Sequence, residues 1–208
     1  MVYKNLFYRL LFSLLFFTVY FIAFNNKYLL FGLGTFIYLL TFYEIFKFFK
    51  NFLIIILFYL FLSYLCFTLY IFNYFDNFIF NFFIFTIIFF DSFSYFAGAI
   101  LGKNYLFKYL SPKKTLEGYI GGFFFTNICL FIYLFLIKET FEIISLVMLV
   151  NLIILIAIIG DLIESYFKRK NCIKDSSNYL PGHGGYFDRF DSFIASIIFL
   201  TLFSLFNI

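Results

Sequence analysis

The residues best suited to chemistry lie together in one segment, Ser165 to Ser192, with the sequence SYFKRKNCIKDSSNYLPGHGGYFDRFDS. These 28 residues hold five of the chain's 15 Lys and Arg, three carboxylates, the sole His and a glycine-rich turn. Arg presents a fork of donors that matches phosphate oxygens, Lys presents a point charge, and converging carboxylates suit Mg²⁺. The segment therefore predicts phosphate and metal chemistry at a membrane surface.

Acidic residues also occur in or beside apolar runs, where an ionised group is costly and usually faces a polar interior. Asp91 interrupts the run IIFFDSFSYF, and Asp161 is expected to close the run IIGDLIES. Asp161 and Ser165 would share a helix face, as would Asp188 and Asp191 if the last helix starts near the glycine pair. Carboxylates from two helix ends would then meet at a Mg²⁺ site. The alternative is that each acid only pairs with a nearby Lys or Arg.

The basic run Lys168–Lys170 taken alone fits an anchor at the cytoplasmic side of a membrane. The pairs Lys174–Asp175 and Asp188–Arg189 alternate in sign, which topology does not require, and they favour phosphate binding by Lys168, Arg169, Lys174 and Arg189.

The turn from Pro181 to Gly185 would let its backbone N–H groups approach an anion, although an ordinary loop is the alternative. His183 could orient a phosphate, act as an acid or base, or have a structural role.

A second polar loop precedes the run that starts near residue 118. Ser111–Pro112 favours a helix start, with Lys113 and Lys114 in or near the first turn, where unpaired N–H groups attract phosphate. Glu117 could pair with a lysine, cap the turn or bind metal. The alternative for this loop is an amphipathic surface segment resting on anionic lipid.

The elements that must position these residues are membrane helices. Hydrophobic residues make up 64% of the chain, charged residues only 12%, and the mean hydropathy is +1.01. A soluble domain averages about 25% charged residues, so the composition excludes a soluble fold and predicts an all-α, polytopic transmembrane bundle. The chain is expected to form a single membrane-embedded domain, 1–208, with N-terminal spans in 1–75 and catalytic spans and loops in 78–207. Runs of about 20 apolar residues predict seven spans: 6–24, 28–46, 52–72, 78–101, 118–137, 143–163 and 190–207.

The basic residues orient these spans. If the N-terminus faces the cytoplasm, 13 of the 15 Lys and Arg fall on that side, and only Lys27 and Lys138 lie outside. Such a bias sets membrane topology, so the polar loops 102–117 and 164–189 are both expected on the cytoplasmic face. The net charge of +4 follows from this topology and indicates no nucleic-acid partner.

The first span begins close to Met1 and lacks a small-residue cleavage site, so we expect it to be retained as an anchor. The three cysteines show no metal-ligand or disulfide pattern.

The motifs in residues 85–195 resemble those of the phosphatidate cytidylyltransferases (CDP-diacylglycerol synthases). The resemblance rests on Asp91-x-x-x-Tyr95-x-x-Gly98, on Ser111 to Gly118, and on a long signature. In this chain the signature consists of Ser165, Lys168-Arg169, Lys174-Asp175, His183-Gly184-Gly185, Asp188-Arg189 and Asp191. Tyr186 and Leu116 depart from the family pattern, which usually has an aliphatic residue or Phe and a Trp there. The chain is also expected to lack some N-terminal spans of typical members.

The resemblance implies transfer of CMP from CTP to phosphatidic acid, with release of pyrophosphate, at the cytoplasmic side of the bacterial inner (plasma) membrane. It implies Mg²⁺ held by Asp161 and Asp188 with help from Ser165 or Asp191, and leaves open a second, monovalent cation and a homodimer. In this interpretation Asp175 belongs to the catalytic signature. Asp91, Ser111, Lys113, Lys114, Glu117, Gly184 and Gly185 bind substrate or organise the site, and His183 contacts a phosphate.

Other functions remain as alternatives. A CTP-dependent lipid alcohol kinase of the dolichol or phytol type would release CDP instead of pyrophosphate. An ion-coupled transporter would use Asp91 and Asp161 within the membrane, but it predicts polar residues throughout the span of the bilayer, whereas here they gather on one face. A degenerate, inactive relative is a third alternative.

Overall fold

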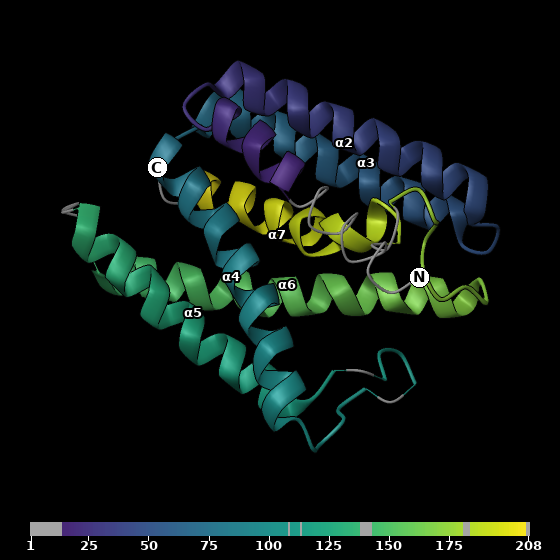
Figure 1. Ribbon diagram of the computed structural model, residues 1–208. Coiled ribbons are helices and arrows are strands. Elements are labelled where there is room, and N and C mark those ends of the chain that lie inside the picture. Colours follow the sequence, from purple (N-terminus) through teal and green to yellow (C-terminus); the bar gives the residue numbers. More distant parts are fainter. Residues whose placement is uncertain (1–13, 108, 113, 138–142, 181–183, 207–208) are drawn as a thin grey trace.

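The computed structural model describes residues 14–107, 109–112, 114–137, 143–180 and 184–206. A short apolar helix, Leu14–Ala23, comes first among them. The longer elements follow in the order α2 (Lys27–Phe48), α3 (Leu53–Leu69), the π-helix η1 (Tyr70–Tyr74), α4 (Asn77–Leu101), α5 (Leu116–Ile137), α6 (Ile143–Lys170) and α7 (Phe187–Phe206). Figure 1 shows α2, α3, α6 and α7 running along one another while α4 and α5 lie across them.

Six of the helical segments in the described residues are long and apolar enough to cross a membrane, η1 counting as the continuation of α3. They match six of the seven predicted spans, and the polytopic helical bundle is confirmed. The first predicted span, 6–24, falls partly on residues 1–13, which lie outside the described residues, and its described part is the helix Leu14–Ala23. The chain is an integral membrane protein.

Side chains from the turns set the start of two of these helices. The Asn26 carboxamide accepts hydrogen bonds from the Tyr28 and Leu29 N–H groups at 3.0 and 3.3 Å at the start of α2. The Asp76 carboxylate accepts the Ile79 N–H at 2.8 Å at the start of α4. Such caps satisfy backbone donors that have no partner within the helix.

The sixth span is longer than predicted. We expected it to end near residue 163, with Asp161 at its close and a loop from 164 to 189, but α6 continues to Lys170. The prediction was wrong because it ended the helix where the apolar run ends, although no Gly or Pro occurs between Asp161 and Lys170. Basic residues in a last turn are favoured by the helix dipole, and here they are Lys168, Arg169 and Lys170.

A Schellman-type cap ends α6. The Ile173 N–H donates to the Lys168 carbonyl and the Cys172 N–H to the Arg169 carbonyl, both at 3.1 Å. Cys172 takes the left-handed conformation, with φ of 55°, at the position where Gly is usual.

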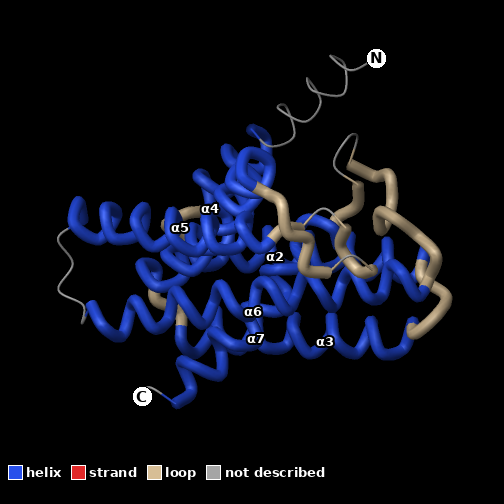
Figure 2. Tube along the Cα trace, turned by 90° about the horizontal axis from the view of Figure 1, so that it is seen from below, coloured by secondary structure: helices blue, strands red, loops and turns tan. Residues whose placement is uncertain are grey.

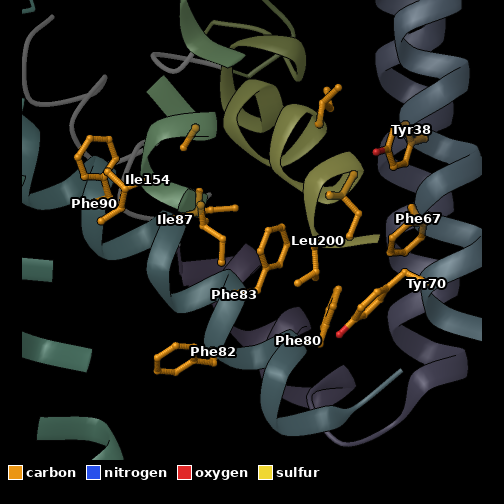
Figure 3. Packing of buried hydrophobic residues seen from close by; sticks show 14 of the residues in the cluster. Tyr38, Phe67, Tyr70, Phe80, Phe82, Phe83, Ile87, Phe90, Ile154 and Leu200 are labelled. Carbon is orange, nitrogen blue, oxygen red and sulfur yellow. The ribbon is translucent and has the colours of Figure 1, made fainter. Parts of the chain in front are cut away.

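The core lies between α3, α4 and α7. Figure 3 shows Phe80 and Phe83 of α4 near Tyr70 of η1, which continues α3, and near Leu200 of α7. All four are nearly or fully buried. Hydrogen bonds join α3 to α7: Ser63 Oγ donates to the Ile194 carbonyl at 2.7 Å. Helices in lipid gain little from apolar burial against one another, so close packing and such hydrogen bonds hold them.

Small residues let two helix pairs approach closely. A Cβ at Gly118 of α5 would lie 2.8 Å from the Ser94 carbonyl oxygen of α4, and one at Gly160 of α6 would lie 2.6 Å from the Ala195 Cβ of α7. Only glycine fits at either crossing. The second crossing brings the polar part of α6 against the first turns of α7.

The long loops gather at one end of the bundle, as Figure 2 shows. Arg169, in the last turn of α6, donates from Nε to the Leu110 carbonyl at 3.2 Å and so ties the two predicted polar loops together. At the same end Asn171 Oδ1 accepts the N–H groups of Lys50 and Asn51 at 2.8 and 2.7 Å. The loops were predicted to share one face, and these contacts place them together.

Gly160→Ala should lower the free energy of unfolding by about 1–3 kcal/mol, because the added methyl group overlaps Ala195 and the Asp191 backbone and overpacks the crossing. Thermal unfolding in detergent measures the change. Gly32→Ala is the matched control, since a Cβ at Gly32 of α2 meets nothing within 4 Å. Equal melting temperatures for the two variants would contradict the close crossing.

Candidate functional site

Three carboxylates meet where α6 crosses α7. Oxygens of Asp161, Glu164 and Asp191 lie within 4.8 Å of one another. Glu164 and Asp191 are buried, and Glu164 Oε1 has no hydrogen-bond partner among the described residues. Buried carboxylates this close repel one another unless a cation lies among them. The three residues therefore fit a divalent cation with oxygen ligands, such as Mg²⁺.

Lys114 supplies positive charge from the other loop. Its ammonium group forms an ion pair with Asp161. Burial disfavours the charged form, but the negative charge of Asp161, with smaller contributions that include Asp91, outweighs this and raises the pKa of Lys114 above its ordinary value. The expected helix start at Ser111 is not where α5 begins: α5 starts at Leu116, so Lys114 lies just before the helix.

Lys168 lies between two acids. Its Nζ is 2.7 Å from Glu164 Oε2, one helical turn earlier, and 2.7 Å from Asp188 Oδ1 of α7. A single ammonium group thus joins α6 to the start of α7 beside the three carboxylates. The sequence placed Lys168 among the phosphate ligands, and in this structure it pairs with acids, which is the alternative that the sequence left open.

Asp188 lies beside the three carboxylates rather than among them. Its Oδ2 accepts the N–H groups of Ser176 and Gly185, both at 2.9 Å, while Oδ1 pairs with Lys168. The carboxylate thereby fixes the chain that leads into α7. Asp191, predicted to assist at the metal, is the α7 residue that joins Asp161 in the group. Ser165 is buried next to Glu164.

The two glycines of the signature are required for different reasons. Gly184 has a φ of 84°, a left-handed conformation that favours glycine. Gly185 leaves space for two side chains, because a Cβ there would overlap the carboxylate of Glu44 and the hydroxyl of Ser176. Asp175 lies next to Gly184, where its Cβ would be 3.6 Å from an added methyl group. The turn is thus packed against charged side chains.

The remaining predicted residues have varied surroundings. Arg169 donates to the Leu110 carbonyl and, from Nη1, to the Ile173 carbonyl at 3.3 Å, so its guanidinium group links two loops. Lys174 and Arg189 have exposed side chains. Asp91 of α4 has charge interactions with Lys114, Asp161 and Arg189, which joins it to the site.

Glu117 orders the loop before α5. Its carboxylate accepts the N–H groups of Lys103 and Asn104 and, at 2.7 Å, the side-chain amide of Asn104. These donors belong to the loop that follows α4, so the carboxylate joins that loop to the first turn of α5. Ser111 takes part in the same loop through its carbonyl, which accepts the Lys114 N–H at 3.2 Å. Lys113 and His183 lie outside the described residues.

Sequence reasoning missed two buried acids, Glu164 and Glu44, both 1% exposed or less. A signal for Glu164 was present, because it lies three residues after Asp161 and four before Lys168, on the same helix face. Glu44 lies far from the other acids in the sequence, and only the packing of α2 against the start of α7 brings it near.

Glu164→Gln should weaken Mn²⁺ binding by at least about tenfold, because it removes one negative charge and one oxygen ligand from the three-carboxylate group. Electron paramagnetic resonance titration of the purified protein with Mn²⁺ measures the affinity without substrates. Asp76→Asn, which keeps a side-chain oxygen for the cap of α4, is the control. Unchanged affinity in Glu164→Gln would remove this residue from the metal site.

Comparison with known proteins shows the family of the chain. The model of the cytidylyltransferase family matches residues 2–206. A phosphatidate cytidylyltransferase of Staphylococcus haemolyticus is 39% identical over 112 residues, which cover 54% of this chain and 43% of that protein. Proteins of the same name from Bacillus subtilis and Haemophilus influenzae are 41% identical over 110 residues and 39% identical over 120 residues.

The matched segments cover 53% and 56% of this chain in those two comparisons, and 41% and 42% of the relatives' own lengths. The similarity therefore spans less than half of each curated relative. The family match, by contrast, extends over almost the whole chain. The chain belongs to the cytidylyltransferase family.

Proposed function

We propose that this chain transfers CMP from CTP to phosphatidic acid, giving CDP-diacylglycerol and pyrophosphate. The observation that carries the proposal is the group of Asp161, Glu164 and Asp191 with Lys114 and Lys168 at its border, in a chain of this family. Acidic and basic side chains in contact at one end of a membrane bundle suit a reaction between two phosphate compounds. One of these is dissolved in water, and the other is held in lipid.

Asp161, Glu164 and Asp191 would hold Mg²⁺, with Asp188 and Ser165 next to them. When bound, the ion supplies positive charge that clamps phosphate oxygens and eases departure of the leaving group. Glu164 Oε1, which has no hydrogen-bond partner in the part of the chain that the structure describes, supports this assignment.

The lysines have a second role in the proposal. Lys114 and Lys168 now neutralise Asp161, Glu164 and Asp188. A divalent cation held by Asp161, Glu164 and Asp191 would neutralise two of these partners, Asp161 and Glu164, and would leave both ammonium groups able to turn to the phosphates of CTP. Arg169 and Lys174 add donors at the same end of the bundle. The Arg169 guanidinium group has more N–H donors than its two described contacts use, so others remain for a phosphate.

The reaction needs no strong base in this scheme. A phosphate monoester has a second pKa of about 6, so the lipid phosphate is mostly ionised near neutrality. One of its oxygens attacks the α-phosphorus of CTP, a new P–O bond forms, and the bond to the bridging oxygen breaks to release pyrophosphate. Positioning and electrostatic stabilisation then account for most of the rate.

An apolar cavity of about 530 Å³ offers a place for the lipid. Phe190 and Phe193 of α7 line it together with Phe80 and Ile87 of α4, and Arg189 is the charged residue in the lining. An apolar cavity with one guanidinium group suits a lipid that carries a phosphate. We propose that phosphatidic acid places acyl carbons here and its phosphate near Arg189.

The experiment that tests the function uses purified chain in detergent–lipid micelles with labelled CTP, phosphatidic acid and Mg²⁺. Lipid-linked CMP and equimolar pyrophosphate, both lost on addition of EDTA, are the expected products. Release of CDP only when a lipid alcohol replaces phosphatidic acid would show a kinase instead. No product from either substrate, in a folded sample, would overturn the proposed chemistry.

Asp188→Asn in the same assay should lower turnover by at least about a hundredfold. An amide at this position loses the charge that Lys168 neutralises and presents N–H groups to the N–H donors of Ser176 and Gly185. Circular dichroism checks that the variant is folded. A rate like that of the parent chain would exclude Asp188 from the site.

The proposed location is the bacterial inner membrane, with both polar loops cytoplasmic, in line with the Lys and Arg bias. Cys172 tests the orientation, because its side chain is exposed in the loop after α6. A membrane-impermeant maleimide should label it in inverted vesicles and not in intact spheroplasts. Asn25→Cys, at the opposite end of α2, should show the reverse pattern in a Cys172→Ser background. The same pattern for both positions would contradict the topology.

A homodimer is a further part of this proposal, and light scattering of the detergent complex tests it.

A further inference from the structure

Glu44 occupies an unfavourable position for a carboxylate. It is fully buried, with 0% of its surface exposed, and lies in the last turns of α2 (Lys27–Phe48). Burial penalises the charge, and the negative end of a helix dipole repels it. Something at this position must offset both costs.

The start of α7 supplies the compensation. Glu44 Oε2 accepts the Tyr186 N–H at 2.7 Å and also interacts with the Phe187 N–H, where α7 begins. Unpaired N–H groups and the positive end of the dipole favour an anion there. A side chain of α2 thus caps a helix that follows more than a hundred residues later in the chain.

The other side of the carboxylate is enclosed by the signature turn. A Cβ at Gly185 would overlap both Glu44 Oε1 and the Ser176 hydroxyl, so the turn folds directly over the acid. Asp188 holds the same turn from within, through the N–H groups of Ser176 and Gly185. Two carboxylates therefore fix the turn, and only Glu44 comes from outside the signature segment.

Further contacts dock the same end of α2 on this region. Lys47 Nζ donates to the Tyr179 hydroxyl at 2.9 Å, one turn beyond Glu44. Asn171 binds the backbone of Lys50 and Asn51 in the turn that follows α2. These hydrogen bonds are exposed to water, whereas the hydrogen bond of Glu44 with Tyr186 is partly buried. Competition from water therefore weakens the Glu44 hydrogen bond least.

We infer that Glu44 is a positioning residue that fixes the start of α7, so that Asp188 and Asp191 face the acids of α6. Its expected effect on turnover rests on the proposed function, but its effect on the turn and on metal binding does not. A shift of about 1 Å in the start of α7 would separate Asp191 from Asp161 and Glu164 and lower affinity for a divalent cation.

The experiment compares Glu44→Ala, Glu44→Gln and the control Thr41→Val in the full chain in micelles. Thr41 is equally buried on α2, and its hydroxyl donates to the Ile37 carbonyl within the helix at 2.9 Å. Mn²⁺ affinity is measured by electron paramagnetic resonance titration. Hydrogen–deuterium exchange is followed at the amides of residues 176 and 184–188.

Glu44→Ala should bind Mn²⁺ at least about tenfold more weakly and exchange the Gly185 and Tyr186 amides at least about tenfold faster. Glu44→Gln should recover part of both losses, because its amide oxygen still accepts the Tyr186 N–H. Thr41→Val should stay within about twofold of the parent chain in both readouts, even if it melts at a lower temperature.

Parent-like Mn²⁺ affinity and exchange in Glu44→Ala would overturn the inference, and so would equal losses in Thr41→Val. If Glu44→Ala does not fold, Glu44→Gln decides alone, and parent-like values in both readouts would overturn it. Neither readout needs CTP or lipid. A chain that transfers no CMP would therefore refute the proposed function and leave this test intact.

Discussion

The structure depends on how negative charge is held at one end of an apolar bundle. Carboxylates at a helix crossing in a membrane protein cost several kcal/mol unless cations neutralise them. Gly160 lets α6 and α7 approach until oxygens of Asp161, Glu164 and Asp191 lie within 4.8 Å of one another. Lys114 pairs with Asp161, and Lys168 pairs with Glu164 and Asp188. The loop before α5 and the turn before α7 are thereby both bound to this charged group.

Much of the fold could be predicted from the sequence, because apolar runs of the right length dictate membrane helices. The residues at which the helices begin and end were harder to predict. α6 ends at Lys170, and Cys172 just beyond it has a left-handed conformation that a cysteine does not indicate in the sequence. The expected start near Ser111 was wrong because the residues just before α5 pair with the loop after α4: the Leu106 N–H donates to the Lys114 carbonyl at 3.3 Å, beside a bridge between Tyr105 and Thr115. Local pattern therefore gave the helices, and tertiary contacts decided where they end.

The candidate site could also be predicted only in part from the sequence. Asp161 and Asp188 were predicted as the metal ligands, with Ser165 or Asp191 assisting, whereas the structure groups Asp161 with Asp191 and Glu164. The Asp188 carboxylate instead accepts the N–H groups of Ser176 and Gly185 and pairs with Lys168. Glu164 was overlooked although its spacing from Asp161 and Lys168 was visible. Glu44 had no local signal, since its importance comes only from the contact of α2 with the turn before α7.

The length of α6 sets the level of the chemistry relative to the bilayer. With 28 residues at 1.5 Å each it is about 42 Å long, whereas the hydrocarbon layer is about 30 Å thick. Asp161 lies about 27 Å from the start of the helix, close to the far boundary of that layer. If α6 crosses the bilayer upright from Ile143, the carboxylates lie near the headgroups of one leaflet and the last turn of α6 extends beyond the hydrocarbon. The proposed reaction would then join a lipid phosphate to a dissolved nucleotide without either one entering the hydrocarbon.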